Sequence, residues 1–131
     1  MSTNDDFYAW LAGQAGVSAI CSDRIYPGTI PQGSAYPCIR FSRDEDGGFK
    51  DFDGQGVTIR VDMQVDNLAD TLDEATDLAQ AVRASLKNYT GAMTSRYVQR
   101  TSLDATFDDY EPNLADGKFR VSQAWTIWLT N

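Results

Sequence analysis

The chain has 131 residues and a net charge of −8, from 11 basic and 19 acidic side chains. It contains no histidine and only two cysteines, which excludes a Ser-His-Asp triad, a histidine-ligated zinc site and a four-cysteine zinc site. The acidic balance also disfavours generic binding to nucleic-acid phosphates, because that contact needs clustered Lys and Arg.

The length and the 42% hydrophobic content predict a single folded domain over residues 1–131. No uninterrupted apolar run approaches the ~20 residues that span a bilayer, so we expect no membrane segment. The first ten residues are acidic where a signal peptide is basic, which favours synthesis in the cytoplasm. In that reducing compartment Cys21 and Cys38 are expected to stay free thiols.

The N-terminal third is expected to contain one helix and two extended segments. Residues 4–14 place Phe7, Trp10 and Leu11 on one side of a short helix, which Gly13 and Gly16 should end. Residues 23–37 hold three of the four prolines and predict a short extended piece followed by a loop. Residues 38–43 resemble a strand with alternating faces.

Residues 57–66 carry the clearest strand pattern of the chain. Val57, Ile59, Val61, Met63 and Val65 alternate with polar residues without exception. A period of two predicts one buried face and one polar face. A shift of one residue would expose all five apolar side chains, so the register is strongly specified.

Residues 68–87 carry the clearest helical pattern, with Asn67 as the expected N-cap. An apolar stripe at helical spacing comprises Leu68, Leu72, Ala75, Ala79, Val82 and Leu86. This helix is expected to lie on the apolar face of the 57–66 strand, and Leu72→Asp is therefore expected to abolish folding.

Two extended stretches follow, an irregular one at 96–107 and a well-alternating one at 118–130, with a turn signal at Asp116-Gly117. The expected order is helix, three strands, helix, two strands. It predicts an α+β fold, in which a mainly antiparallel sheet is packed on one face by the long amphipathic helix and the short N-terminal helix.

A loop rich in glycine and acid spans residues 44–56. Its acidic residues are Asp44, Glu45, Asp46, Asp51 and Asp53. A calcium-loop pattern starting at Asp51 fails at its third ligand and at its final glutamate position, and no helices flank it. The remaining interpretations are a solvated hairpin tip and a docking or pore-lining loop.

The sequence offers no catalytic constellation. Asp108, Asp109 and Glu111 precede a proline and are expected to form a solvated turn rather than an acid–base or magnesium site. No nucleophile is accompanied by a base. We therefore predict no catalytic residues, no metal site and no cofactor.

The two tryptophans of the last strand, three residues apart, are expected to point to opposite faces of the sheet. Trp125 shares a face with Ile127 and should lie in the core, whereas Trp128 falls on the polar face. Either the N-terminal helix covers Trp128, or this side chain contacts another protein. The polar face also carries Arg60 and Arg120, a mixture that suits a polar assembly interface.

The order of these pieces resembles the tail terminator (tail completion) proteins of long-tailed bacteriophages. The resemblance spans almost the whole chain and is carried by "RIYPGTIPQGSAYPCI", the strand "GVTIRVDMQV", the helix "LADTLDEATDLAQAVRASL" and the closing strand "KFRVSQAWTIWL". "RIYPGTIPQGSAYPCI" is the most telling of these segments. Its motif is structural, and other small phage neck proteins share similar sizes and elements.

The resemblance implies a structural virion protein without enzymatic activity. Such proteins form a hexameric ring on the head-proximal end of the tail tube, stop polymerisation of the tube protein and present a surface to the head–tail connector. Genomic DNA passes through the ring without specific binding. The assembly interface is then expected to include Arg24, Tyr26, Pro27, Arg60, Arg120 and Trp128.

Two other functions stay open. One is a head–tail connector or stopper in the same neck region. The other is an acidic binding module that mimics DNA. If the 44–56 loop lines the channel of a ring, its carboxylates repel DNA. This lumen hypothesis predicts that Asn at positions 44, 46, 51 and 53 leaves folding and ring formation intact.

Overall fold

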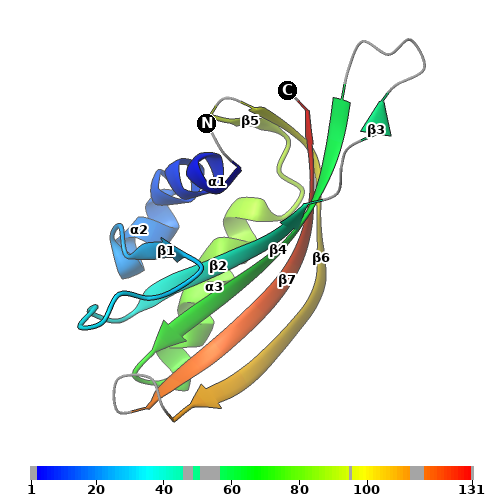
Figure 1. The fold of residues 1–131 in the computed structure, drawn as a ribbon. Coiled ribbons are helices and arrows are strands. Elements are labelled where there is room, and N and C mark those ends of the chain that lie inside the picture. The colour runs from blue at the N-terminus through cyan, green and yellow to red at the C-terminus, as the bar shows by residue number, and fades with distance from the viewer. Residues whose placement is uncertain (1–2, 46–48, 51–56, 95, 113–116, 131) are drawn as a thin grey trace.

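The structure is a computed structural model that describes residues 3–45, 49–50, 57–94, 96–112 and 117–130. Its elements follow the order of Figure 1. The helices are α1 (Thr3–Ala12), α2 (Ala15–Cys21) and α3 (Leu72–Leu86). The strands are β1 (Ile25–Pro27), β2 (Cys38–Glu45), β3 (Phe49–Lys50), β4 (Val57–Ala69), β5 (Gly91–Met93), β6 (Arg96–Glu111) and β7 (Lys118–Thr130). No helix in these ranges is both long and apolar enough to cross a membrane.

The strands form one sheet in the order β1-β2-β4-β7-β6-β5, with β3 added beside β4. All neighbours are antiparallel except β1 and β2, which are parallel. The longest uninterrupted register joins β4 to β7, from Thr58 opposite Thr130 to Ala69 opposite Phe119. The sheet and its helices confirm the predicted α+β class.

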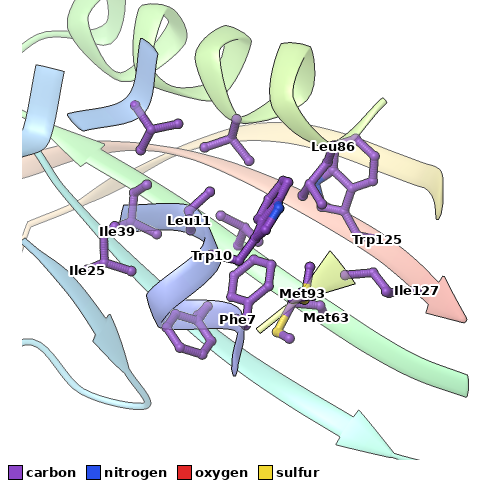
Figure 2. Close-up of a cluster of buried hydrophobic side chains, with 14 of the residues drawn as sticks. Phe7, Trp10, Leu11, Ile25, Ile39, Met63, Leu86, Met93, Trp125 and Ile127 are labelled. Atoms are coloured by element: carbon purple, nitrogen blue, oxygen red, sulfur yellow. The ribbon is translucent and has the colours of Figure 1, made fainter. Parts of the chain in front are cut away.

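The three helices lie on one face of the sheet and enclose the core (Figure 1). Alternate residues of β4 and β7 point to that face, including Met63, Trp125 and Ile127, all of them buried. Figure 2 shows these side chains meeting Phe7, Trp10 and Leu11 of α1 and Leu86 of α3. The predicted alternation of both strands and the core position of Trp125 are thus confirmed.

The start of α3 differs from the prediction. Strand β4 continues to Ala69, so Asn67 and Leu68 belong to the strand and not to the helix. The N-cap is Thr71, whose hydroxyl oxygen accepts a hydrogen bond from the Glu74 backbone N–H at 3.2 Å. Leu72 is the first helical residue and is 38% exposed, so the expectation that Leu72→Asp abolishes folding is wrong.

The N-terminal region contains two helices where one was expected. The chain turns at Gly13, and α2 then runs through Gly16 instead of ending there. In the first turn of α1 the Asp6 carboxylate is fully buried. It receives a hydrogen bond from Thr94 and lies 3.6 Å from the Arg96 guanidinium. This contact fastens α1 to β5 and β6, because a buried charge is stable only when paired.

Both cysteines are free thiols, as predicted, and both are buried. Burial raises the pKa of the Cys21 thiol to about 11 and that of Cys38 to about 12. The native state therefore favours the neutral thiols, while the unfolded chain ionises near pH 9. This contribution to stability is complete below pH 9 and is lost as the pH rises toward 12.

The corrected start of α3 predicts opposite outcomes for two leucines of this helix. Leu78→Ala should lower the free energy of unfolding by about 2–5 kcal/mol, because Leu78 is fully buried. Leu72→Asp should change it by less than about 1 kcal/mol, since the side chain is exposed and an acid suits the first helical turn. Urea denaturation of both variants measures the difference. Equal destabilisation by the two substitutions contradicts the placement of α3.

The burial of the thiols predicts slow alkylation. At pH 8 the native protein should resist iodoacetamide, because both thiols are buried and protonated. In urea above the unfolding midpoint both should react at the rate of a free thiol. Mass spectrometry counts the adducts. Rapid modification of the native protein at either cysteine contradicts the burial of these thiols.

Candidate assembly surface

The face of the sheet that points away from the helices is polar. It is built from the alternate residues of β2, β4, β7 and β6 that do not enter the core. Its charged residues include Arg40, Asp44, Arg60, Asp62, Asp66, Arg100, Asp109, Glu111 and Arg120. We call this surface the open face.

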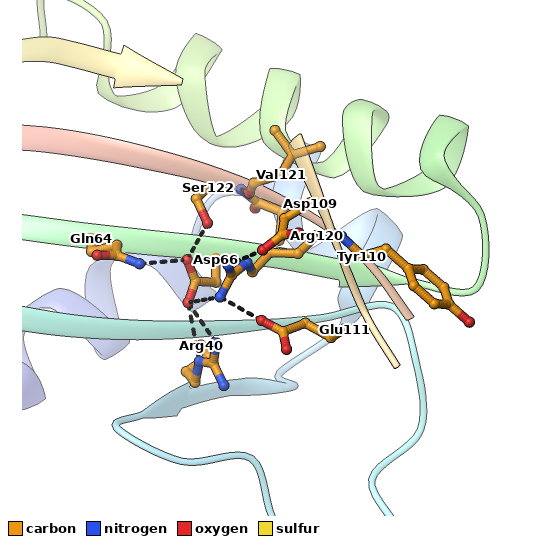
Figure 3. Close-up of polar contacts among 10 residues, drawn as sticks. Arg40, Gln64, Asp66, Asp109, Tyr110, Glu111, Arg120, Val121 and Ser122 are labelled. Atoms are coloured by element: carbon orange, nitrogen blue, oxygen red, sulfur yellow. Dashed lines mark hydrogen bonds and ion pairs between the residues drawn. The ribbon is translucent and has the colours of Figure 1, made fainter. Parts of the chain in front are cut away.

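Asp66 of β4 is the centre of a network on the open face (Figure 3). Only 4% of this residue is exposed. Its Oδ2 accepts hydrogen bonds from Arg40 Nη2 at 2.8 Å and Arg40 Nε at 3.1 Å. Its Oδ1 accepts hydrogen bonds from the Ser122 hydroxyl at 2.6 Å and the Gln64 amide at 3.1 Å. The carboxylate is thereby satisfied by cations and dipoles on three neighbouring strands.

Arg120 of β7 extends the network to β6. Its Nη1 lies 4.0 Å from Asp66 Oδ2 and 2.7 Å from Glu111 Oε1. Its Nη2 donates to Asp109 Oδ2 at 2.6 Å (Figure 3). The predicted solvated turn at 108–111 is therefore wrong. These residues form the last part of β6, and two of their carboxylates neutralise an arginine whose side chain is mostly buried.

The network joins neighbouring strands through their side chains. Each carboxylate in it faces a guanidinium group, and Asp66 also accepts from a hydroxyl and an amide N–H. Its members lie on β2, β4, β7 and β6, and the ion pairs therefore join four strands across the sheet. Because Asp66 is shielded from water, loss of its charge leaves the Arg40 guanidinium without its carboxylate partner, whereas Arg120 keeps Asp109 and Glu111.

The other end of the open face carries a shallow hollow of about 420 Å³. Arg60 and Asp62 form an ion pair there at 3.2 Å, and the Thr126 hydroxyl bonds to the carboxylates of Asp62 and Asp104. The hollow is open, and charged side chains line it beside apolar ones, unlike the enclosed apolar sites that small molecules prefer. Within the described ranges no three acidic or cysteine side chains are arranged to hold a metal ion.

The predicted interface residues fall into two groups. Arg60, Arg120 and Trp128 share the open face, and Trp128 is the cross-strand neighbour of Arg60. Helix α1 packs on the opposite face, which rules out the alternative that it covers Trp128. The half-buried tryptophan thus belongs to the polar face, as its parity predicted.

The remaining predicted interface residues lie at the outer edge of the sheet, in and beside β1. Arg24 precedes this strand, and its Nε donates to the Pro37 carbonyl at 3.0 Å. The Tyr26 hydroxyl pairs with that of Ser34 at 2.9 Å. Pro27 ends the strand after only three residues. A short edge strand that ends in proline has few free N–H groups, so this edge is poorly suited to adding another strand.

The acidic loop is only partly described. Asp44 and Glu45 form the end of β2, and Asp44 is exposed on the open face opposite Asp62. Asp46, Asp51 and Asp53 lie outside the described residues. The placement of the loop as a lumen or partner contact therefore stays a prediction.

Sequence reasoning missed the partners of Asp66. The alternation places Asp66, Arg40 and Ser122 on polar faces, but it does not show that they meet. Arg40 and Asp66 are 26 residues apart, and Ser122 is 56 residues from Asp66. One signal was available in the sequence. Asp66 is an acid near the end of the 57–66 strand pattern, and in the structure this polar residue is buried.

Comparison with known proteins supplies the family. The family model described as "Tail completion protein gp17" matches residues 5–129. Among solved structures, a chain of the "Virion of native gene transfer agent (GTA) particle" has the same fold, with a TM-score of 0.74 and 14% sequence identity. The alignment covers 99% of this chain and 96% of that chain. No curated protein sequence matches at a significant level.

The Asp66 network predicts unequal effects for two aspartates of β4. Asp66→Asn should lower the free energy of unfolding by on the order of 3 kcal/mol, because it removes a buried charge that Arg40 and Arg120 share. Asp62→Asn is the matched control. Its carboxylate is 43% exposed, so the loss should stay below about 1 kcal/mol.

Urea denaturation of both variants at pH 7 checks this prediction. A loss at Asp66 no larger than that at Asp62 would show that the network does not stabilise the sheet.

Proposed function

Because the chain belongs to the tail completion protein gp17 family of structural bacteriophage tail proteins, we propose that it caps the head-proximal end of the tail tube as a ring. The ring stops polymerisation of the tube protein and provides the surface for head–tail joining. The family match over almost the whole chain carries this proposal.

The two edges of the sheet support a ring of identical subunits. The edge at β1 is short and ends in Pro27, while β6 is a long strand that β5 covers only over its first three residues. Two unlike surfaces favour a head-to-tail contact rather than a symmetric dimer, and head-to-tail contacts close into rings when the rotation between subunits permits. We propose six subunits in the ring, as the family resemblance implies.

The surface chemistry supports a role in protein assembly without turnover of a substrate. Four acidic residues of the open face, Asp62, Asp66, Asp109 and Glu111, are paired with arginines or hydroxyl groups. The net charge of −8 is unfavourable for binding DNA phosphates. A ring of such subunits lets genomic DNA pass without holding it. The partners we propose are copies of the chain, the tube protein and the head–tail connector.

The proposal predicts an effect on the length of tail tubes. Purified tube protein that polymerises on its own should give tubes whose length keeps growing with time. Adding this protein in substoichiometric amounts should halt growth at one end, because each capping ring blocks one tube terminus. Electron microscopy of negatively stained tubes measures their lengths.

An equal amount of a heat-denatured sample is the control. Tubes that grow equally long with and without the folded protein contradict the capping function. Blockage of DNA release from filled heads without any effect on tubes would instead favour a connector or stopper.

A further inference from the structure

A groove runs beside β6 at the C-terminal end of α3. One part of it, about 250 Å³, lies between the end of α3 and residues 101–103 of β6, with Trp125 among its lining residues. A second part lies between residues 88–90 and residues 99–102. The two parts share Asn88, Thr101 and Ser102 and are therefore continuous. We call this feature the α3–β6 groove.

Three cationic residues line this groove. Arg83 and Lys87 lie on the helix side of the β6 edge, and Arg100 lies on its open-face side as the cross-strand neighbour of Trp128. All three are exposed, and none has a hydrogen bond or ion pair to another residue within the described ranges. The other cationic side chains that the structure describes are engaged with oxygen atoms, those of Arg24, Arg40, Arg43, Arg60, Arg96, Lys118 and Arg120. In an acidic chain, cations without a partner among the described residues thus flank the edge of β6 on both faces of the sheet.

The helix end alone does not account for this cluster. Arg83 and Lys87 suit the negative end of the α3 dipole, and that explains their positions. Arg100 belongs to β6 and gains nothing from the dipole, yet it lines the same groove. A groove with three uncompensated cations attracts an anionic group.

The edge of β6 is a second feature of the groove. Strand β5 pairs only with residues 96–98 of β6, so the outer side of residues 99–103 has no neighbouring strand in the described part of the chain. Such an edge can accept an extended segment.

The chain itself contains a segment of matching charge. Residues 44–53 carry Asp44, Glu45, Asp46, Asp51 and Asp53, with Lys50 as the one cation. This stretch is the densest run of acid in the sequence. It begins at the end of β2, and β2 lies on the opposite side of β4 and β7 from the β6 edge.

We propose that the α3–β6 groove binds the acidic 44–53 segment of a second copy of this chain. The contact is head-to-tail, because the groove and the acidic segment are different surfaces of the protomer. It rests on the proposed ring and specifies which surfaces join neighbouring subunits. Arg83, Lys87 and Arg100 pair with the carboxylates of the neighbour, while the free edge of β6 receives its backbone.

Charge reversal in two variants tests the proposal. The groove variant carries Arg83→Glu, Lys87→Glu and Arg100→Glu, and the loop variant carries Asp46→Lys, Asp51→Lys and Asp53→Lys. Each variant alone should remain monomeric, because groove and segment then carry like charges. An equimolar mixture should assemble, since each variant offers the complement of the other. Native mass spectrometry of the mixture should show rings in which the two variants alternate.

The mixture distinguishes a contact between copies from docking within one chain. Docking of the segment onto its own groove cannot be restored by a second variant. Assembly of either variant alone at the wild-type level overturns the proposal. So does a mixture that stays monomeric under conditions in which the wild type assembles.

A matched control separates local pairing from net charge. Asp23→Lys, Asp73→Lys and Asp77→Lys together change the net charge by the same amount as the loop variant, at exposed sites away from the 44–53 segment. This control should assemble as the wild type does. If it fails as completely as the loop variant, overall charge sets assembly and the proposal is wrong. Circular dichroism confirms that each variant is folded.

A peptide assay keeps the test independent of ring formation. A synthetic peptide with the sequence of residues 44–56 should bind the loop variant, whose groove is intact and whose own segment is repelled. Its affinity for a variant that carries both sets of substitutions should be at least about tenfold weaker. Equal affinities overturn the proposal. A wild-type chain that stays monomeric even with tail tubes contradicts the proposed ring, whereas the peptide result bears on the groove alone.

The lumen hypothesis and the docking proposal make opposite predictions for replacing the loop aspartates by asparagine. Asn at positions 44, 46, 51 and 53 should leave ring formation intact if the loop lines a channel. If the segment binds the groove of its neighbour, the same variant should assemble about tenfold less tightly or worse. Concentration-dependent light scattering measures the difference, and unchanged assembly of the Asn variant overturns the docking proposal.

Discussion

The strict alternation of β4 and β7 is the constraint on which the rest of the structure depends. These two central strands pair over twelve residues in one continuous register. One face must then be apolar, and it is the face that receives all three helices. The other face must be polar, and it can hold charged groups next to one another across several strands. A shift by one residue would exchange the two faces, so core and open face are fixed together.

Much of the fold was predictable because its signals are local. The alternation at 57–65 and 119–129 identified both central strands, and Trp125 and Trp128 were assigned to opposite faces by parity alone. The junction near residue 70 was not predictable in this way. Leu68 and Leu72 fit a helical stripe equally well, although the first ends a strand and the second is an exposed helix start. Helix α2 was missed because Gly13 precedes it and Gly16 lies in its first turn, and both glycines suggest a helix end.

The candidate surface was less predictable than the fold, since its contacts join distant parts of the chain. Asp109 and Glu111 looked like a turn before a proline, and only the pairing of β6 with β7 brings them to Arg120. Among the described residues, internal ion pairs engage Arg40, Arg60, Arg96, Lys118 and Arg120. Arg83, Lys87 and Arg100 form no such pair there, and these three residues line the groove beside the free edge of β6.

The central claim is that the protein works through contacts between its exposed edges, neighbouring copies and a tubular partner, without chemical turnover. Cryo-electron microscopy of tail tubes incubated with the purified protein tests it most directly. The account predicts a closed ring of copies on one end of each tube, with the groove of one subunit against the next. Protein that is absent from tube ends, or that coats the tube wall as single molecules, would contradict it.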